Sequence, residues 1–570
     1  MNSPIFGVTR TGQAFNLICG GEVILAEIAI YYEDEAVRPV LFDTISGDGH
    51  TAFRIALYNN KHLRVGTVTG RYVWNESEIL LQFSDDNISF IGTIPLGKDV
   101  LCCRLDSDLK NRVFHVQSGC DRPPVATAIY YPQRDCALEI FYCSWDKVNS
   151  KIIVERGNKK CVLRARSNVL GRKGPLLTNS KEHFPEAPTG WCSWYAYYQQ
   201  ITEQNWERNI RWLAANLRDY GCTWAQIDDG WQNYNASRET EGGRDWFGSN
   251  YKFPSGISKV AEIVKEHGMR PGIWLIPQKI DRDDLYQENP EYFLHRNNGE
   301  PVKHTDWAPD NTAMYVVDTT NPQAIKDYYK PLIDMVINEW GFEYLKIDDQ
   351  PRLAQVYQDP ELLLYDRTYS GLEAYRKSLQ IIKDILGSQR FLLGCYGIPL
   401  EGLGIFDGSR TSGDMGATWE LSQTVIEAVF EWGFLNGIAW WSDPDTVCVR
   451  DPLTIDEARI IATLVSLTGQ VFMASDFMYE LPAERVEILR RTMPTFHTLP
   501  VELHRWERTK RNRPDFVVAS IGREWANYFV VAVFQWTKEL EEYRAHIPNL
   551  IKTIKILDQK EHLGLSTEQI

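Results

Sequence analysis

Short apolar runs, separated by Gly, Asn, Asp and Pro, make up the first part of the chain as far as Asn179. Runs of this length with turn-forming residues between them are typical of β-strands, and no helical period interrupts them. The pattern predicts an N-terminal β-sandwich domain over residues 1–184. The clearest expected strands cover residues 22–31, 63–68, 112–116, 125–131 and 151–155.

From Pro185 onward, strand-like apolar runs alternate with segments of helical spacing. Eight such strands in one series predict a (β/α)8 TIM barrel over residues 185–498. The expected strands cover 189–194, 223–227, 270–276, 342–347, 391–395, the segment entering Arg410, 437–441 and 470–474. The expected helices cover 257–268, 322–340, 370–386, 418–432 and 455–467.

Strand-like runs return after Thr498, for example over residues 515–520 and 527–534. They predict an antiparallel β-rich domain over residues 499–570. This stretch is short for a full sandwich, so we expect a truncated or reduced domain.

Composition narrows the class of protein. A hydrophobic share of 44% and a charged share of 24% are ordinary globular values, which excludes a disordered, collagenous or coiled-coil architecture. The net charge of −15 and the lack of a basic run argue against a nucleic-acid partner. No apolar run is long enough to cross a membrane, and no secretory signal is visible.

The eleven Cys are scattered without a Cys-x-x-Cys pair, which is typical of reduced thiols. We therefore expect a cytoplasmic protein, or a secreted one if a signal had been removed. Whether it forms a homo-oligomer is left open.

Active sites of TIM barrels lie at the carboxyl ends of the strands. In this chain those ends carry mainly carboxylates and Trp, and no His. Glycoside cleavage uses two carboxyl groups for bond chemistry and aromatic faces for stacking on sugars. Because no His-x-His or His/Asp spacing occurs there, we expect no metal and no other cofactor. The residues at these ends are Trp194, Asp228, Asp229, Trp231, Gln278, Lys279, Asp348, Asp349, Cys395, Arg410 to Asp414, Asp443, Asp445 and Asp476.

Four ordered motifs carry a family resemblance. They are Gly190-Trp-Cys-Ser-Trp194, Gln226-Ile-Asp-Asp-Gly-Trp-Gln232, Tyr344-Leu-Lys-Ile-Asp348 and Arg410-Thr-Ser-Gly-Asp414. Together they cover the barrel, about half the chain, and the chain resembles glycoside hydrolase family 36. That family includes α-galactosidases and raffinose-synthase-like and seed-imbibition-like proteins. The resemblance implies a retaining mechanism on a small α-galactoside substrate.

The resemblance also assigns the two catalytic carboxyl groups. Asp348 follows Lys346 at the end of the fourth strand and corresponds to the nucleophile. Neighbouring strand residues face opposite ways, so Asp348 shares a face with Lys346 and Asp349 does not. Asp414, in an Arg-x-x-x-Asp element after the sixth strand, corresponds to the acid/base.

The resemblance gives other residues roles in substrate binding. Asp228 and Asp229 correspond to the element that binds sugar hydroxyls, and Asp443 is a further candidate for such contacts. Lys346 and Arg410 would donate charge-assisted hydrogen bonds to hydroxyls. Three further sets have no single interpretation. The four residues Trp194, Trp231, Trp274 and Trp441 could stack on the sugar or fill the core, and Cys395 could line the pocket or be structural. Gln278-Lys279 stands where many microbial relatives of the family have an acidic residue, so the substrates could differ.

We therefore expect a retaining, exo-acting α-galactosidase-like enzyme. Two enzymatic alternatives remain, namely galactosyl transfer to a sugar acceptor and another α-glycosidase specificity such as α-glucosidase. An alternative from a different class is a catalytically silent sugar-binding protein with the same barrel mouth.

Overall fold

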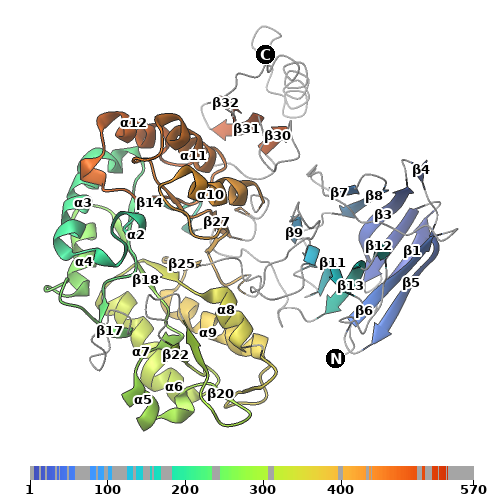
Figure 1. Cartoon of the computed structure of the whole chain (residues 1–570), viewed down its shortest axis with the longest axis horizontal. Helices are drawn as coiled ribbons and strands as arrows, with labels where there is room; N and C mark the ends of the chain where they lie inside the picture. The colour runs from blue at the N-terminus through green and yellow to red at the C-terminus, as the bar shows by residue number, and fades with distance from the viewer. Residues whose placement is uncertain are drawn as a thin grey trace, which may run out of the picture.

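The computed structural model describes three parts of the chain (Figure 1). The first is a set of strands between Phe6 and Ser167. The second is residues 183–496, except 234–243, 306–312, 358, 396–401, 403, 432–435 and 438–439. The third is residues 503–506, 516–523, 526–534 and 536.

The central part contains a parallel, nearly closed sheet of the TIM-barrel type, and all eight predicted strands occur in it (Figure 1). Every pair of neighbours is parallel, as βα repeats require. In spatial order the strands are β27 (Trp441–Asp443), β26 (Gly408–Arg410), β25 (Phe391–Gly394), β23 (Tyr344–Ile347), β18 (Arg270–Leu275), β15 (Trp224–Ile227), β14 (Thr189–Cys192), β29 (Phe472–Ala474) and β28 (Thr446–Val447).

The ninth strand arises because the seventh one is broken. β27 pairs with β26 on one side of the barrel, and β28 pairs with β29 on the other. Between them Asp445 has a φ of 83°, which bends the chain at Pro444-Asp445. The break places two carboxylates at the mouth, where the predicted strand over 437–441 would have ended earlier.

Aromatic rings fill the amino-terminal end of the barrel. Trp224, Tyr344 and Phe391 begin the strands β15, β23 and β25, and the rings of Tyr344 and Phe391 stack with centroids 5.3 Å apart. Gly272 on β18 makes room for them, since a Cβ there would lie 2.7 Å from the Tyr344 ring. Because this end is packed, space for a ligand is left to the carboxyl end.

The helices alternate with these strands and surround the sheet (Figure 1). Capping boxes start two of them, at Ser370 with Glu373 and at Thr454 with Glu457. All five predicted helices occur, whereas α3, α8 and α12 were not predicted. The helices are α3 (Glu203–Asn216), α4 (Ile257–Glu266), a continuous run of α6, η6, α7 and η7 (Pro322–Ala324, Ile325–Tyr329, Lys330–Asp334 and Met335–Glu339), α8 (Gln350–Tyr357), α9 (Gly371–Leu386), α10 (Trp419–Glu431), α11 (Ile455–Leu467) and α12 (Ala483–Thr492).

Small elements after the first three strands build the rim of the mouth. After β14 come α2 (Trp194–Tyr197) and η3 (Tyr198–Gln200), and after β15 comes the hairpin of β16 (Gln232–Asn233) and β17 (Asp245–Ser249). A small antiparallel sheet of β19 (Lys279–Ile280), β22 (Ala313–Val316) and β21 (Lys303–Thr305) follows β18.

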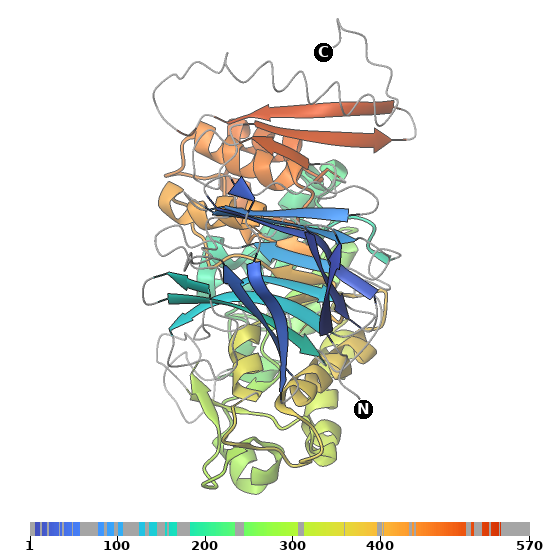
Figure 2. The same ribbon diagram turned by 90° about the vertical axis from the view of Figure 1, so that its right-hand side faces the viewer.

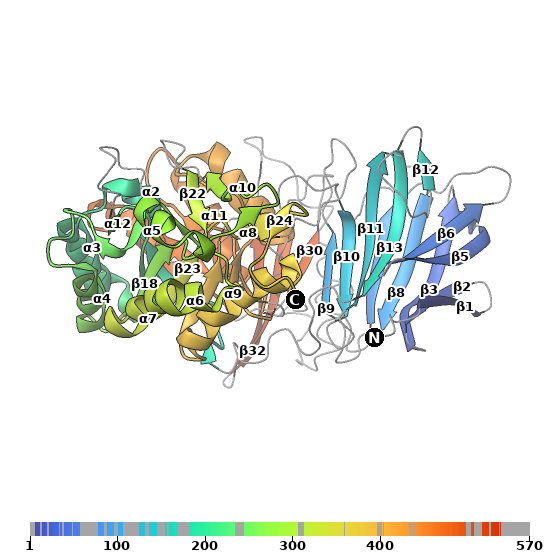
Figure 3. The same ribbon diagram turned by 90° about the horizontal axis from the view of Figure 1, so that it is seen from below.

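The N-terminal strands form two antiparallel sheets, seen from two further directions in Figures 2 and 3. One contains β1 (Phe6–Thr11), β2 (Ala14–Cys19), β3 (Glu22–Tyr32), β4 (Glu35–Ala36), β7 (Glu78–Ser84) and β8 (Ile88–Pro95). The other contains β5 (Pro39–Gly47), β6 (His50–Leu57), β9 (Leu101–Leu105), β10 (Val125–Tyr131), β11 (Cys136–Ser144), β12 (Val154–Arg156) and β13 (Lys159–Ser167). The expected strands at 63–68 and 112–116 lie outside the described residues, and the packing of the two sheets as a sandwich stays a prediction.

Near the C-terminus, β30 (Leu503–Trp506), β31 (Phe516–Arg523) and β32 (Ala526–Val533) form an antiparallel sheet. The domain boundaries at 184/185 and 498/499 stay predictions. Among the described residues, no helix has both the length and the apolar character needed to cross a bilayer.

Candidate active site

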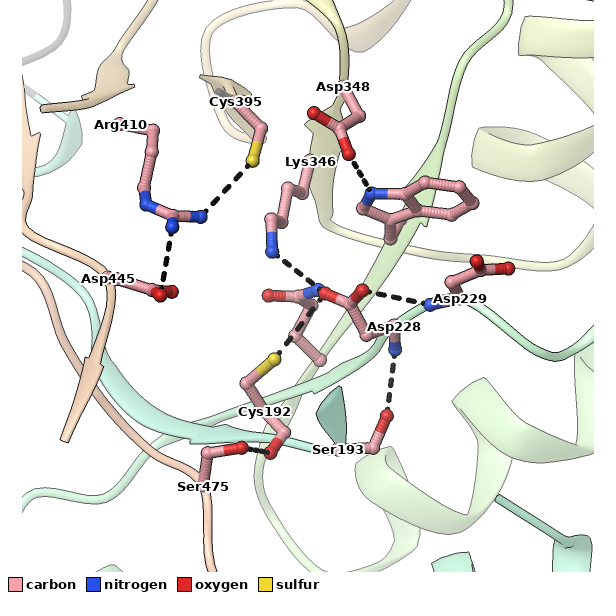
Figure 4. Close-up of polar contacts among 12 residues, drawn as sticks. Cys192, Ser193, Asp228, Asp229, Lys346, Asp348, Cys395, Arg410, Asp445 and Ser475 are labelled. Atoms are coloured by element: carbon pink, nitrogen blue, oxygen red, sulfur yellow. Dashed lines mark hydrogen bonds and ion pairs between the residues drawn. The ribbon is translucent and has the colours of Figure 1, made fainter. Parts of the chain in front are cut away.

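A buried ion pair joins two strands across the barrel mouth (Figure 4). The Nζ of Lys346, on β23, donates to Oδ2 of Asp228, after β15, over 2.8 Å. Gln226 and the thiol of Cys192 donate to the same oxygen, over 2.6 and 3.5 Å. Burial, the largest single cause, lowers the pKa of Lys346, but Asp228 together with Cys395 and Cys192 raises it by more, and the pKa lies well above its ordinary value. The mouth therefore holds a fixed ammonium and carboxylate.

Asp229, the next residue, lies with a different set of partners. Arg244 and Gln232 each donate to its Oδ1 over 2.6 Å, and Gln199 donates to Oδ2 over 2.9 Å. Its side chain is 1% exposed. Burial, the largest single cause, raises the pKa of Asp229, but Arg244 together with the hydrogen bonds from Gln199 and Gln232 lowers it by more, and the net pKa is lowered. In this structure the carboxylate is thus enclosed by protein donors, and its predicted contact with a sugar hydroxyl stays a prediction.

Asp348 lies at the end of β23 and is partly exposed. The indole Nε1 of Trp274 donates to its Oδ2 over 2.9 Å (Figure 4), and the backbone N–H of Asp349 donates to its Oδ1 over 2.6 Å. The carboxylate of Asp349 is buried instead against Lys279. The two neighbouring carboxylates therefore have different surroundings, as predicted. Because β23 ends at Ile347, the turn at Asp349, with a φ of 61°, separates them rather than strand alternation.

Arg410, at the end of β26, contacts the site residues on the opposite side of the barrel mouth. Its buried guanidinium reaches Asp414 Oδ1 at 2.9 Å, Asp445 Oδ2 at 2.8 Å and the Cys395 Sγ at 3.5 Å. Asp414 keeps 49% of its side chain exposed. This carboxyl group is accordingly anchored by Arg410 and open to solvent at the same time.

Asp445 is the buried member of this group. In addition to its ion pair with Arg410, Asp445 Oδ2 accepts two hydrogen bonds. The hydroxyl of Tyr195 donates over 2.7 Å, and the backbone N–H of Met415 donates over 2.9 Å. Burial raises the pKa of Asp445 to about 6, against the pull of Arg410. Asp443 is also buried with a raised pKa, again because of burial, and its role toward substrate hydroxyls stays a prediction.

Cys395 links the two sides of the mouth. Burial raises the pKa of its thiol well above the ordinary value, and the negative charges of Asp348 and Asp414 raise it further. Lys346 and Arg410 act in the opposite direction. Both candidate catalytic carboxylates thus lie within electrostatic reach of one buried thiol between the fourth and sixth strands.

Two of the four Trp residues offered as a stacking wall belong to the core instead. Trp231 is 0% exposed, donates its Nε1 to the carbonyl of Trp274 over 2.9 Å and packs against Trp246 and Trp340. Trp441 is buried and donates to the carbonyl of Phe184. The expectation of a sugar contact at Trp231 is corrected, because its ring has no face open to a ligand in this structure.

The other two Trp residues lie closer to the chemistry. Trp274 is almost fully buried but directs its N–H to Asp348. Trp194 begins α2 and packs edge-on against Tyr198, with ring centroids 5.2 Å apart. Trp274 therefore acts through its N–H rather than through its ring.

Sequence reasoning missed Gln226 and Tyr195 as members of the site. Gln226 lies two residues before Asp228, so strand alternation could have found it. Tyr195 has no local signal, because its partner Asp445 is 250 positions away. Within the described residues, no group of three or more His, Cys, Asp or Glu side chains is arranged to hold a metal ion.

Comparison with known proteins bears on the same segment. Residues 178–383 match the family described as Melibiase. α-Galactosidase 1 of Pediococcus pentosaceus is 26% identical over 166 residues, which are 28% of this chain and 21% of that protein. The α-galactosidase of Escherichia coli is 31% identical over 148 residues, 26% of this chain and 20% of that protein. The matched segments thus span about one fifth of these curated relatives.

Among solved structures, the α-galactosidase TtGalA of Thermus thermophilus, in complex with stachyose, is similar with a TM-score of 0.51. The alignment has 19% identity and covers 86% of this chain and 99% of that one, so it shows the shared fold. The family match and the curated relatives support an O-glycosyl hydrolase. Within that class they support the α-galactosidase family that the sequence motifs suggest.

Proposed function

We propose that this chain is a retaining glycoside hydrolase of the family 36 type that releases terminal α-linked galactose. Asp348 is the nucleophile and Asp414 the acid/base. The observation that carries the proposal is that these two solvent-accessible carboxylates follow β23 and β26 at the same end of one barrel, where Trp274 holds Asp348 and Arg410 holds Asp414. Glycosidases of this kind need one carboxylate on each side of the scissile bond.

In the first step Asp348 attacks the anomeric carbon from the face opposite the leaving group, and the bond from that carbon to the glycosidic oxygen breaks. Asp414 delivers its proton to the departing oxygen. In the second step Asp414 takes a proton from water, which attacks the glycosyl-enzyme and frees Asp348. Trp274 and the backbone N–H of Asp349 hold the Asp348 carboxylate in one orientation throughout.

The same mouth is suited to a polyhydroxylated ring. Asp228 accepts and Lys346 donates charge-assisted hydrogen bonds, and a pyranose hydroxyl both donates and accepts. Arg410 supplies a second fixed cation on the opposite side. Since these charges are held by protein partners before a ligand arrives, they need little rearrangement on binding.

The test is a panel of aryl α- and β-galactosides and glucosides with the freed sugar followed by NMR. We expect hydrolysis of the α-galactoside, with α-galactose as the first product. First formation of β-galactose would refute the retaining mechanism, and turnover of the α-glucoside alone would refute the specificity. If sucrose as an acceptor diverts most product into a new oligosaccharide, galactosyl transfer replaces hydrolysis as the activity.

Variants test the assigned roles. Asp348→Ala should lose turnover by orders of magnitude while staying folded, and Asp219→Ala, at an exposed carboxylate, is the matched control. If Asp349→Ala is the inactive variant and Asp348→Ala is active, the nucleophile is assigned one residue too early. Asp414→Ala should lose activity on poor leaving groups and regain turnover with azide on an activated aryl galactoside; wild-type rates without azide would refute its role.

A further inference from the structure

A second acidic residue lies beside Asp348 in a strained backbone conformation. Asp349 has a φ of 61°, in the left-handed region that residues other than Gly rarely adopt. Besides Gly, Asp and Asn occur there most often, because their short polar side chains can form local hydrogen bonds. The side chain of Asp349 must therefore gain something that holds the turn.

That gain is an ion pair with Lys279. Lys279 lies on β19, outside the barrel strands, and its side chain is 0% exposed, with that of Asp349 at 4%. The Lys279 ammonium also donates to Nδ1 of His304, on β21, over 2.9 Å. Arg352, on α8, lies 3.5 Å from the other Asp349 oxygen. Three elements thus converge on one carboxylate.

The anchored turn directs a backbone donor at the proposed nucleophile. The N–H of Asp349 donates to Asp348 Oδ1 over 2.6 Å, while Trp274 serves Oδ2. The side-chain amide of Gln350 donates to the Asp348 carbonyl over 2.7 Å and so fastens the same turn from the next residue. A relaxed turn at Asp349 would take this N–H away from the carboxylate.

We propose that Lys279 and Asp349 form a positioning pair that locks the turn after the fourth strand and thereby orients Asp348 and favours its ionised form. This inference rests on the proposed function and adds to it two residues that do not touch the substrate. A role in stability alone is a poor explanation, because a buried ion pair is often no more stabilising than apolar residues of similar volume.

Several charged groups surround Asp348 and enter any pH measurement. Lys346 lies on β23, just before Asp348, Cys395 directly follows β25, and Arg410 ends β26. Lys279, His304 and Arg352 contact the neighbouring carboxylate of Asp349. His304→Gln is therefore needed as a variant, because it removes the one imidazole of this set and keeps a hydrogen-bonding side chain beside Lys279.

The experiment compares kcat and kcat/KM against pH, on an aryl α-galactoside, for Lys279→Met, Asp349→Asn and the double variant. Losing an N–H donor raises the pKa of a carboxylate. The pH at which kcat/KM falls on the acidic side of its profile, here called the acidic limb, should therefore rise by about one pH unit. In the same variants kcat should fall about tenfold, and KM should stay nearly unchanged. Lys279→Arg should recover part of the lost kcat, and His304→Gln should keep the acidic limb of kcat/KM at its wild-type pH.

Two controls separate positioning from folding. Lys383→Met breaks the ion pair of Lys383 with Asp407. Asp407 precedes β26, at the opposite end of the barrel, so this variant should leave the acidic limb of kcat/KM at its wild-type pH. The double variant has no unpaired buried charge, so it covers the case in which Lys279→Met fails to fold. A wild-type acidic limb in folded Asp349→Asn and in the double variant would overturn the inference.

The same data separate this inference from the proposed function. If the wild type hydrolyses no glycoside, the proposed function fails and the positioning role falls with it. If the wild type is active, Asp348→Ala is inactive and the limb does not move in the pair variants, only the positioning role fails.

Discussion

The buried carboxylate of Asp445 gives a quantitative prediction about stability. Burial raises its pKa from the ordinary 3.8 to about 6. The folded protein thus holds the proton more tightly than the unfolded chain does, so folding is favoured while Asp445 is protonated. As the pH rises from about 4 to about 6, this contribution is lost.

The size of the loss follows from the difference in pKa. A difference of about two units corresponds to about 3 kcal/mol of unfolding free energy, since one unit is about 1.4 kcal/mol. Asp445→Asn mimics the protonated form at every pH. Asn also tolerates the φ of 83° at this position. Relative to wild type, the variant should therefore be about 3 kcal/mol more stable near neutral pH than near pH 4.

Urea unfolding followed by Trp fluorescence measures this difference, with both proteins compared at about pH 4 and about pH 7.5. Asp456→Asn, at a carboxylate that is 87% exposed, is the control and should follow wild type at both pH values. An equal difference between wild type and Asp445→Asn at the two pH values would refute the reasoning, since it would mean that burial does not oppose ionisation of Asp445.

Three further predictions concern the mouth. Trp274→Phe keeps an aromatic side chain but removes the donor to Asp348, so kcat should fall by roughly tenfold to a hundredfold, and an unchanged kcat would contradict it. Because the phenyl ring is smaller than the buried indole, thermal stability should also fall. Lys346→Met leaves Asp228 buried without its cation and should destabilise the fold by about 3–5 kcal/mol in urea unfolding, most of which the added change Asp228→Asn should restore. Cys395 should resist iodoacetamide at about pH 8 in the folded protein and react in urea, as mass spectrometry would show, because burial disfavours its thiolate.

The barrel could be read from the sequence because its signals are local. Each strand is a short apolar run, each helix has its own period, and a helix such as α9 carries its capping residues beside it. Alternation along β23 also predicted that Asp348 and Asp349 would face different ways. The broken seventh strand was not predicted, because its second half is defined only by pairing with β29.

The sequence by itself determined which carboxylates stand at the strand ends, because that depends on a few neighbouring residues. Only the tertiary structure decided what surrounds each of them. It enclosed Asp229 with Arg244, put the ring of Trp231 into the core and brought Lys279 to Asp349. Burial and ion pairing depend on residues far apart in the chain, such as Lys346 and Asp228 at a separation of 118 positions, and no local pattern records them.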